Sequence, residues 1–176
     1  MPRLFLYGLG LSLVPPGGAA PERTRLTGWR AAFAGRSAGT WGTRDNPAPV
    51  LALVPGSSCR GMSLEVAPAE LEEILSRWAE LEDVDQSVEG DAEVGLPFRR
   101  DPARVVSRTT SRPAKAVAAL PPERLARMAL VARGRKGTGA DYLRELTAAM
   151  RAWGIDEPIV TALLREVGKE AGEAWR

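Results

Sequence analysis

Short apolar runs alternate with turns rich in glycine and proline along the first two thirds of the chain, a pattern typical of β-strands. The predicted strands are Leu4 to Gly8, Leu26 to Phe33, Val50 to Val54, Cys59 to Val66 and Arg104 to Thr109. The stretch from Asp83 to Asp101 is polar and lacks such a run. We therefore expect it to be a flexible loop.

Apolar residues recur at helical spacing in the segment after Pro68, and again along the last third of the chain. The first predicted helix presents Leu71, Ile74, Leu75, Trp78 and Leu81 on one face. The others run from Pro122 to Ala132, from Ala140 to Trp153 and through Ile159 to Val167, with the tail from Gly168 expected to fray. Strands that mostly precede helices predict an α+β fold with mainly antiparallel pairing, and 176 residues fit a single domain, 1–176.

The charges are balanced, with 24 basic and 22 acidic residues and a net charge of +2. No basic run is long enough to follow a phosphate backbone, so we expect no nucleic-acid partner. No apolar run is long enough to span a membrane, and we expect none as a partner. The sequence leaves the oligomeric state open.

The single cysteine, Cys59, cannot form an internal disulfide, which favours a cytoplasmic protein. A second interpretation concerns the N-terminus, where Arg3, an apolar run and small residues at 17–20 outline a signal peptide. The same residues fit a buried first strand followed by a glycine turn. Both interpretations stay open at this point.

The chain contains no histidine, which excludes Ser-His and Cys-His catalysis and most zinc sites. Proton transfer near neutral pH must therefore use a carboxylate, a tyrosine or a lysine with a shifted pKa. The glycines Gly8, Gly10 and Gly17 do not match a dinucleotide-binding fingerprint. The residues therefore favour neither a common zinc site nor a dinucleotide site.

Three stretches resemble a known family. The first is Gly28-Trp29-Arg30 through Phe33, then Trp41-Gly42-Thr43, Pro47 and Val50 through Gly61; the second is Gly137 through Leu143, with Leu146 and Gly154-Ile155-Asp156; the third is Tyr7-Gly8. In this order they resemble the ChaC branch of the γ-glutamylcyclotransferases, the branch specific for glutathione. Two departures are an absent asparagine before Tyr142 and Leu9-Gly10 where that family continues with serine and leucine.

The resemblance implies a small mixed β-barrel with flanking helices. It also implies a lyase that cleaves glutathione, or another γ-glutamyl compound, into 5-oxoproline and the released amine, which is Cys-Gly for glutathione. The substrate's own α-amine attacks its γ-carbonyl, and a glutamate near the end of the first helix acts as acid and base. No cofactor takes part.

Glu82 and Glu80 are the candidates for that glutamate. At roughly 100° per residue, Glu82 lies about 20° in phase from Leu71 and falls within the apolar stripe, whereas Glu80 lies about 180° away on the solvated face. Burial beside Trp78 would raise the pKa of Glu82 towards the range of a useful base. The alternatives are that the helix ends before Glu82, or that the ungapped family spacing applies and puts Leu81 in the position of the glutamate.

Substrate contacts are expected from two places. Tyr7, Gly8, Leu9 and Gly10 follow a strand and can present backbone N–H groups to a carboxylate or an oxyanion, or can simply form a turn. Tyr142 follows a glycine loop at a helix start and can reach a pocket, or can be a core tyrosine with a satisfied hydroxyl. Two functional alternatives remain: an inactive relative that binds a γ-glutamyl ligand or a protein, and a cyclotransferase for another γ-glutamyl amine.

Overall fold

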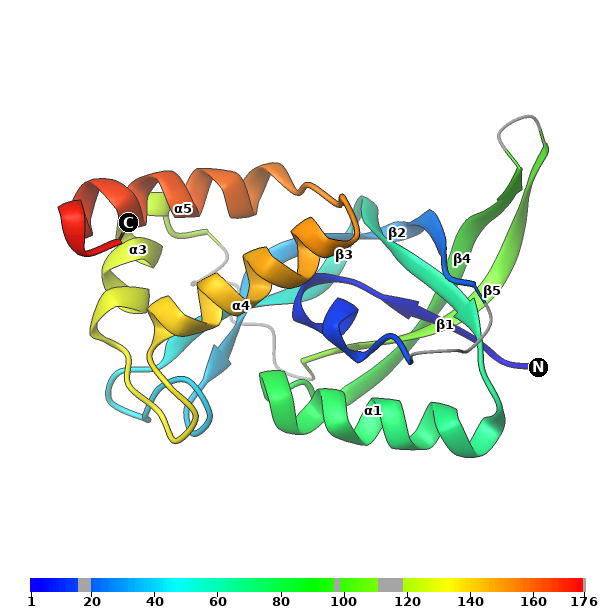
Figure 1. The fold of residues 1–176 in the computed structure, drawn as a ribbon, viewed down its shortest axis with the longest axis horizontal. Coiled ribbons are helices and arrows are strands. Elements are labelled where there is room, and N and C mark those ends of the chain that lie inside the picture. The colour runs from blue at the N-terminus through cyan, green and yellow to red at the C-terminus, as the bar shows by residue number, and fades with distance from the viewer. Residues whose placement is uncertain (16–19, 97–98, 111–118, 176) are drawn as a thin grey trace.

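A closed barrel of five strands forms the centre of the structure, a computed structural model that describes residues 1–15, 20–96, 99–110 and 119–175 (Figure 1). The strands are β1 (Arg3–Leu6), β2 (Glu22–Ser37), β3 (Ala48–Glu65), β4 (Gln86–Leu96) and β5 (Arg99–Thr109). Around the barrel their order is β1-β3-β2-β4-β5. The pair β1 and β5 is parallel and the other described pairs are antiparallel, which confirms the mixed barrel.

β3 is one long strand where we predicted two strands joined by a turn. Pro55 pairs with Trp29 and Ser58 pairs with Thr27, so the chain continues along β2 instead of reversing. The register shifts between these pairs, where Gly28 has a φ of +83°. A bulge opposite an equally long partner strand therefore absorbs the glycine- and serine-rich residues that suggested a turn.

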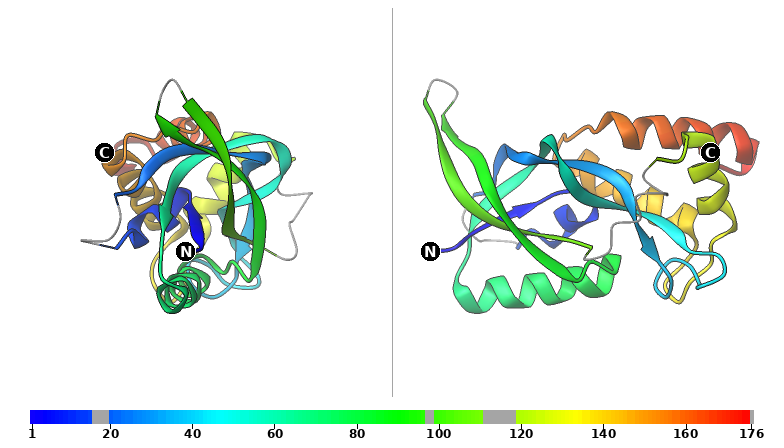
Figure 2. Two further views of the ribbon diagram at one scale, coloured as in Figure 1. Left: turned by 90° about the vertical axis from the view of Figure 1, so that its right-hand side faces the viewer. Right: turned by 180° about the vertical axis from the view of Figure 1, so that it is seen from behind.

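The prediction of a flexible loop from Asp83 to Asp101 is wrong. β4 and β5 pair along their whole length, from Gln86 opposite Thr109 to Leu96 opposite Arg99. The inward positions Val88, Gly90 and Ala92 alternate with exposed polar residues. Because two of these three side chains are so small, the period-two pattern has little apolar content. The hairpin extends past the barrel as a long arm (Figure 2).

The helices confirm the predicted segments. They are α1 (Pro68–Glu82), α3 (Pro122–Val131), α4 (Gly139–Ala152) and α5 (Pro158–Ala171), with short 3-10 helices η1 (Gly8–Leu13) and η2 (Gly172–Trp175). The expected fraying from Gly168 is wrong, because α5 continues to Ala171 and Trp175 folds back to lie under the Arg144 guanidinium at 4.7 Å. Within the described residues, no helix has the combined length and apolar character needed to cross a bilayer.

β1 is an integral strand of the barrel. Leu4, Phe5 and Leu6 are fully buried, and they pair with β3 on one side, while Leu4 pairs with Val106 of β5 on the other. This confirms that the apolar start of the chain forms a buried strand. The glycine turn predicted at residues 17–18, and the small residues of the signal-peptide outline up to 19, lie outside the described residues.

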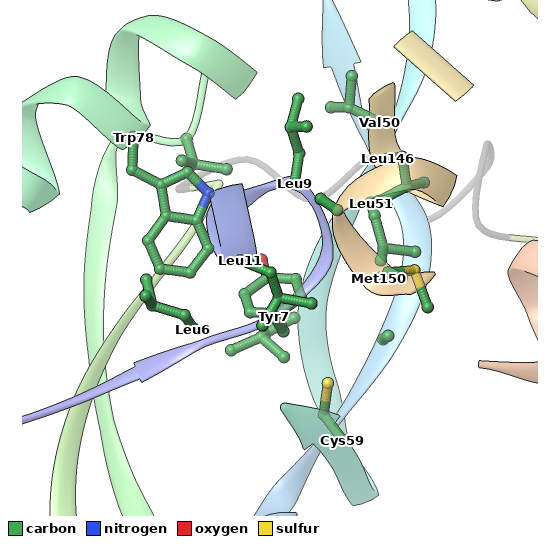
Figure 3. Close-up of a cluster of buried hydrophobic side chains, with 14 of the residues drawn as sticks. Leu6, Tyr7, Leu9, Leu11, Val50, Leu51, Cys59, Trp78, Leu146 and Met150 are labelled. Atoms are coloured by element: carbon green, nitrogen blue, oxygen red, sulfur yellow. The ribbon is translucent and has the colours of Figure 1, made fainter. Parts of the chain in front are cut away.

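The chain after β1 turns into η1, which packs between two helices that are distant in the sequence. Figure 3 shows Leu9 and Leu11 of this segment between Trp78 on α1 and Leu146 and Met150 on α4. Gly8 makes the turn possible, since its φ is +55°, a conformation that residues with a Cβ rarely adopt. This packing brings β1, α1 and α4 together at one buried point.

Candidate active site

Glu82 is the last residue of α1, and its side chain is fully buried. It follows Ile74, Leu75 and Trp78 on the buried face of the helix, as its helical phase predicts. Asp83 takes a left-handed conformation with a φ of 53° and ends the helix immediately afterwards. The alternative that the helix ends before Glu82 and leaves it in solvent is therefore wrong.

The Glu82 carboxylate accepts hydrogen bonds from three segments of the fold. The Trp78 indole N–H donates to Oε2 at 2.6 Å, and the Tyr142 hydroxyl donates to Oε1 at 2.7 Å. The backbone N–H of Leu9 is a third donor. These groups belong to α1, α4 and η1, so the tertiary packing creates the site.

Burial raises the pKa of Glu82 from 4.5 to about 7. The hydrogen bonds from Tyr142, Trp78 and Leu9, together with the positive charge of Lys136, favour the ionised form and limit this rise. The carboxyl group therefore exchanges its proton near neutral pH, where a general acid-base group is most effective.

Tyr142 lies in the first turn of α4, where Thr138 and Asp141 form a capping box. Its hydroxyl accepts a hydrogen bond from the Leu51 N–H at 2.8 Å and donates to Glu82. Burial, followed by the charge of Glu82, raises the pKa of this hydroxyl well above its usual value. It is thus a core tyrosine with a satisfied hydroxyl, and it also reaches the candidate site, where it donates to Glu82.

The Tyr7–Gly10 segment lies against Glu82, as required for a shared site. Within it, Leu9 contributes its backbone N–H to the carboxylate, while its side chain is buried in the core. The Tyr7 hydroxyl donates to the carbonyl of Arg108 at 2.9 Å, and its ring packs against Trp78 with the centroids 5.2 Å apart. Gly8 and Gly10 form the turn without adding side chains.

Glu80 is exposed and points away from this cluster, as its helical phase predicts. Leu81, the position given by ungapped family spacing, is partly buried and carries no titratable group. Its carbonyl accepts a hydrogen bond from the Trp41 indole N–H at 2.8 Å. Of the three positions considered, the structure therefore brings only Glu82 into the site.

Two contributors to the site are missing from the sequence-based candidates. The sequence places Trp78 on the apolar face of the first predicted helix, and its spacing of four residues from Glu82 also favours a contact between the two side chains. Trp41 is part of a stretch that carries the family resemblance, and in the structure its indole caps the end of α1 through the Leu81 carbonyl. Nothing in the sequence around Trp41 indicates a partner 40 residues away.

No metal-binding group is found in the described parts of the chain, since no three His, Cys, Asp or Glu side chains gather there. Cys59 is buried and its thiol contacts the carbonyl of Arg60 at 3.5 Å. Burial, with the nearby charge of Glu157, raises the pKa of this thiol well above its usual value. Cys59 is thus a poor nucleophile and packs as a core residue.

Comparison with solved structures identifies a shared fold. The crystal structure of a γ-glutamyl cyclotransferase specific to glutathione, from yeast, superposes with a TM-score of 0.78 at 15% identity, over 96% of this chain and 98% of that chain. A selenomethionine-labelled structure with the same description gives 0.74 at 17% identity, over 96% of each chain. A search of curated proteins found no match. The profile of the ChaC-like protein family matches residues 19–170, and the chain therefore belongs to the ChaC-like protein family.

Proposed function

We propose that this protein is a γ-glutamylcyclotransferase that cleaves glutathione to 5-oxoproline and Cys-Gly. The observation that carries the proposal is the buried carboxyl group of Glu82, with a pKa of about 7, where α1, α4 and η1 meet. Membership of the ChaC-like family and the fold shared with the yeast enzyme specific to glutathione support the same activity.

The reaction requires two proton transfers that one carboxyl group can perform. The α-amine nitrogen of the glutamyl group attacks the γ-carbonyl carbon, a C–N bond forms, and the amide bond to the cysteinyl nitrogen breaks. The α-ammonium first loses one proton to Glu82, and Glu82 returns that proton to the departing nitrogen. The second proton, which the ring nitrogen loses as the lactam forms, leaves with the released amine, which departs as an ammonium ion. Because the proton is returned, the carboxylate is regenerated in each turnover.

The protein's own hydrogen bonds leave one acceptor position of the Glu82 carboxylate unused. An ionised carboxylate accepts about four hydrogen bonds, and the protein supplies three, from Trp78, Tyr142 and Leu9. The substrate ammonium group would occupy the remaining acceptor position. Its positive charge would further favour the ionised form of Glu82 while the substrate binds.

We assign substrate contacts to the Tyr7–Gly10 segment and to Tyr142, which lie beside the carboxylate. The side chains of Leu51 and Trp78 fill the space beside Gly8 and Gly10, so this segment would contact a ligand through its backbone N–H groups. Leu9 replaces the serine of the family pattern, but a backbone N–H does not depend on side-chain identity. Since the attack is intramolecular, holding the glutamyl chain folded lowers much of the entropic barrier.

A second candidate function is ligand binding without turnover. Two observations favour it: the Glu82 side chain is fully buried with protein donors on both oxygens, and Leu9 lacks the hydroxyl of the family pattern. A third candidate is the same reaction on another γ-glutamyl amine, because no described contact specifies the leaving group.

The test is release of 5-oxoproline from glutathione by the purified protein, measured by mass spectrometry. We expect equal rates with and without a strong chelator, and a strongly reduced rate for Glu82→Gln. Product from a different γ-glutamyl amine, but not from glutathione, would change the assigned substrate. No product from a panel of such amines, combined with measurable ligand binding, would establish the non-catalytic candidate.

We further propose a cytoplasmic location, supported by the buried, unpaired Cys59. Fractionation of cells that produce the tagged protein tests this directly.

A further inference from the structure

The ring of Trp78 lies against a glycine of η1 at a distance that excludes any side chain there. A Cβ built on Gly10 would lie 2.5 Å from Cε2 of the indole and 3.0 Å from Cδ2, and closer still to Cζ2. Trp78 is fully buried, and the Tyr7 ring packs on it. The indole therefore cannot move away without disturbing the core.

This contact restricts position 10 to a residue without a side chain. A larger residue here, such as leucine, and an indole in this place exclude each other. The glycine leaves the space that the indole occupies. Gly10 and Trp78 thus form a sterically coupled pair.

The indole held in this space makes the shortest hydrogen bond to Glu82, 2.6 Å from Nε1 to Oε2. An indole N–H only donates, so Oε2 always faces a donor, whereas the Tyr142 hydroxyl at Oε1 both donates and accepts. Together the two contacts fix both carboxylate oxygens. Trp78 thereby orients the carboxylate and favours its ionised form.

We propose that Trp78 is a positioning residue for Glu82, and that Gly10 is required because it makes room for the indole that holds this carboxylate. The inference rests on the proposed function for its catalytic meaning. Its physical content, a donor that sets the orientation and proton affinity of Glu82, does not depend on that activity.

The first experiment needs no variant at Trp78 and no activity. In protein labelled with ¹⁵N at the indoles, one of the five tryptophan Nε1–H signals should shift with a midpoint near pH 7, in step with Glu82. Glu82→Gln should abolish that titration. If no indole signal responds near this pH in the unmodified protein, the proposal is wrong whatever the enzyme assay shows.

The second experiment removes the donor. In Trp78→Phe, the midpoint of Glu82, followed by its ¹³C carboxyl signal, should rise by about one pH unit, because a hydrogen bond to a charged group is lost. For active protein, kcat should fall about tenfold with little change in KM, and the acidic limb of the pH profile should move upwards. The control is Trp29→Phe, which changes a partly exposed indole whose N–H donates to the backbone carbonyl of Glu89 at 3.4 Å.

Gly10→Ala tests the steric coupling between Gly10 and Trp78. It also replaces the second experiment if Trp78→Phe does not fold. The added Cβ should displace the intact indole and raise the Glu82 midpoint in the same direction. In a Trp78→Phe background, the same alanine should cost less stability, because the ring edge that it meets is smaller. Additive costs, or a Glu82 midpoint unchanged in a folded variant, would overturn the proposal. A complete lack of activity with these titrations intact would count only against the proposed function.

Discussion

At the scale of single residues, the fold buries one carboxyl group, Glu82, completely, and burial disfavours its charged form. Burial raises the pKa of Glu82, and three donors keep the charged form accessible. The residue is therefore poised between two protonation states. Its neighbour Glu80, two positions away, is exposed.

Replacing Glu82 tests the catalytic assignment directly. In Glu82→Gln, kcat for 5-oxoproline release should fall at least about 100-fold, because the group that moves the proton is gone, while KM changes little. Glu80→Gln is the matched control and should alter the free energy of unfolding by less than about 0.5 kcal/mol. Equal activity of both variants would show that the proton shuttle lies elsewhere.

The same group makes stability depend on pH. In the folded chain Glu82 has a pKa of about 7, above the 4.5 of an unperturbed glutamate, so between these values the folded state binds more protons than the unfolded state. Its stabilising contribution is fully present below pH 4.5 and is lost as pH rises through 7, in total roughly 3 kcal/mol. Urea unfolding from pH 4 to 8 should show this loss of stability in the unmodified protein but not in Glu82→Gln. The same pH dependence of stability in both proteins would contradict the prediction.

At the scale of elements, the end of α1 decides where Glu82 lies. Its terminal carbonyls have no partners within the helix, and Thr40 and Trp41 from the segment between β2 and β3 supply donors to Glu80 and Leu81. Trp41 also packs against Tyr142, with ring centroids 5.6 Å apart. One residue thus ties α1 to α4 beside the candidate site.

Trp41→Phe should therefore destabilise the protein by about 2 to 3 kcal/mol, through a lost hydrogen bond and a cavity. Trp29→Phe makes the same chemical change at a partly exposed position, and its cost should stay below about 1 kcal/mol. Chemical denaturation of both variants measures the difference. Similar small costs would show that the Trp41 contact does not hold the end of α1.

At the scale of the whole molecule, β1 closes the barrel by pairing with β3 and β5. The chain leaving β1 supplies Leu9 to the site, so loss of this segment would open the barrel and remove a Glu82 donor. We therefore predict that the mature protein retains Tyr7 and Gly8. Mass measurement of protein isolated from its native host tests this, and a mature N-terminus near Ala20 would contradict it.

The sequence alone determined the features that depend on local periodicity and volume. Helical spacing predicted α1, α3, α4 and α5, because one face of each helix must be apolar to pack. It also distinguished the buried Glu82 from the exposed Glu80. It failed where pairing between distant strands outweighs local signals, as in the bulged β3 and the small-residue alternation of β4.

Tertiary structure alone decided what surrounds the carboxylate. The donors Leu9 and Tyr142 lie 73 positions before and 60 positions after Glu82 in the chain, and no local pattern encodes their meeting. The same holds for the fit of the Trp78 indole against Gly10, which depends on how η1 packs on α1. The sequence determined which side of its helix Glu82 occupies, whereas packing between distant segments determined its hydrogen bonds and its pKa, because burial and donor contacts arise only when those segments meet.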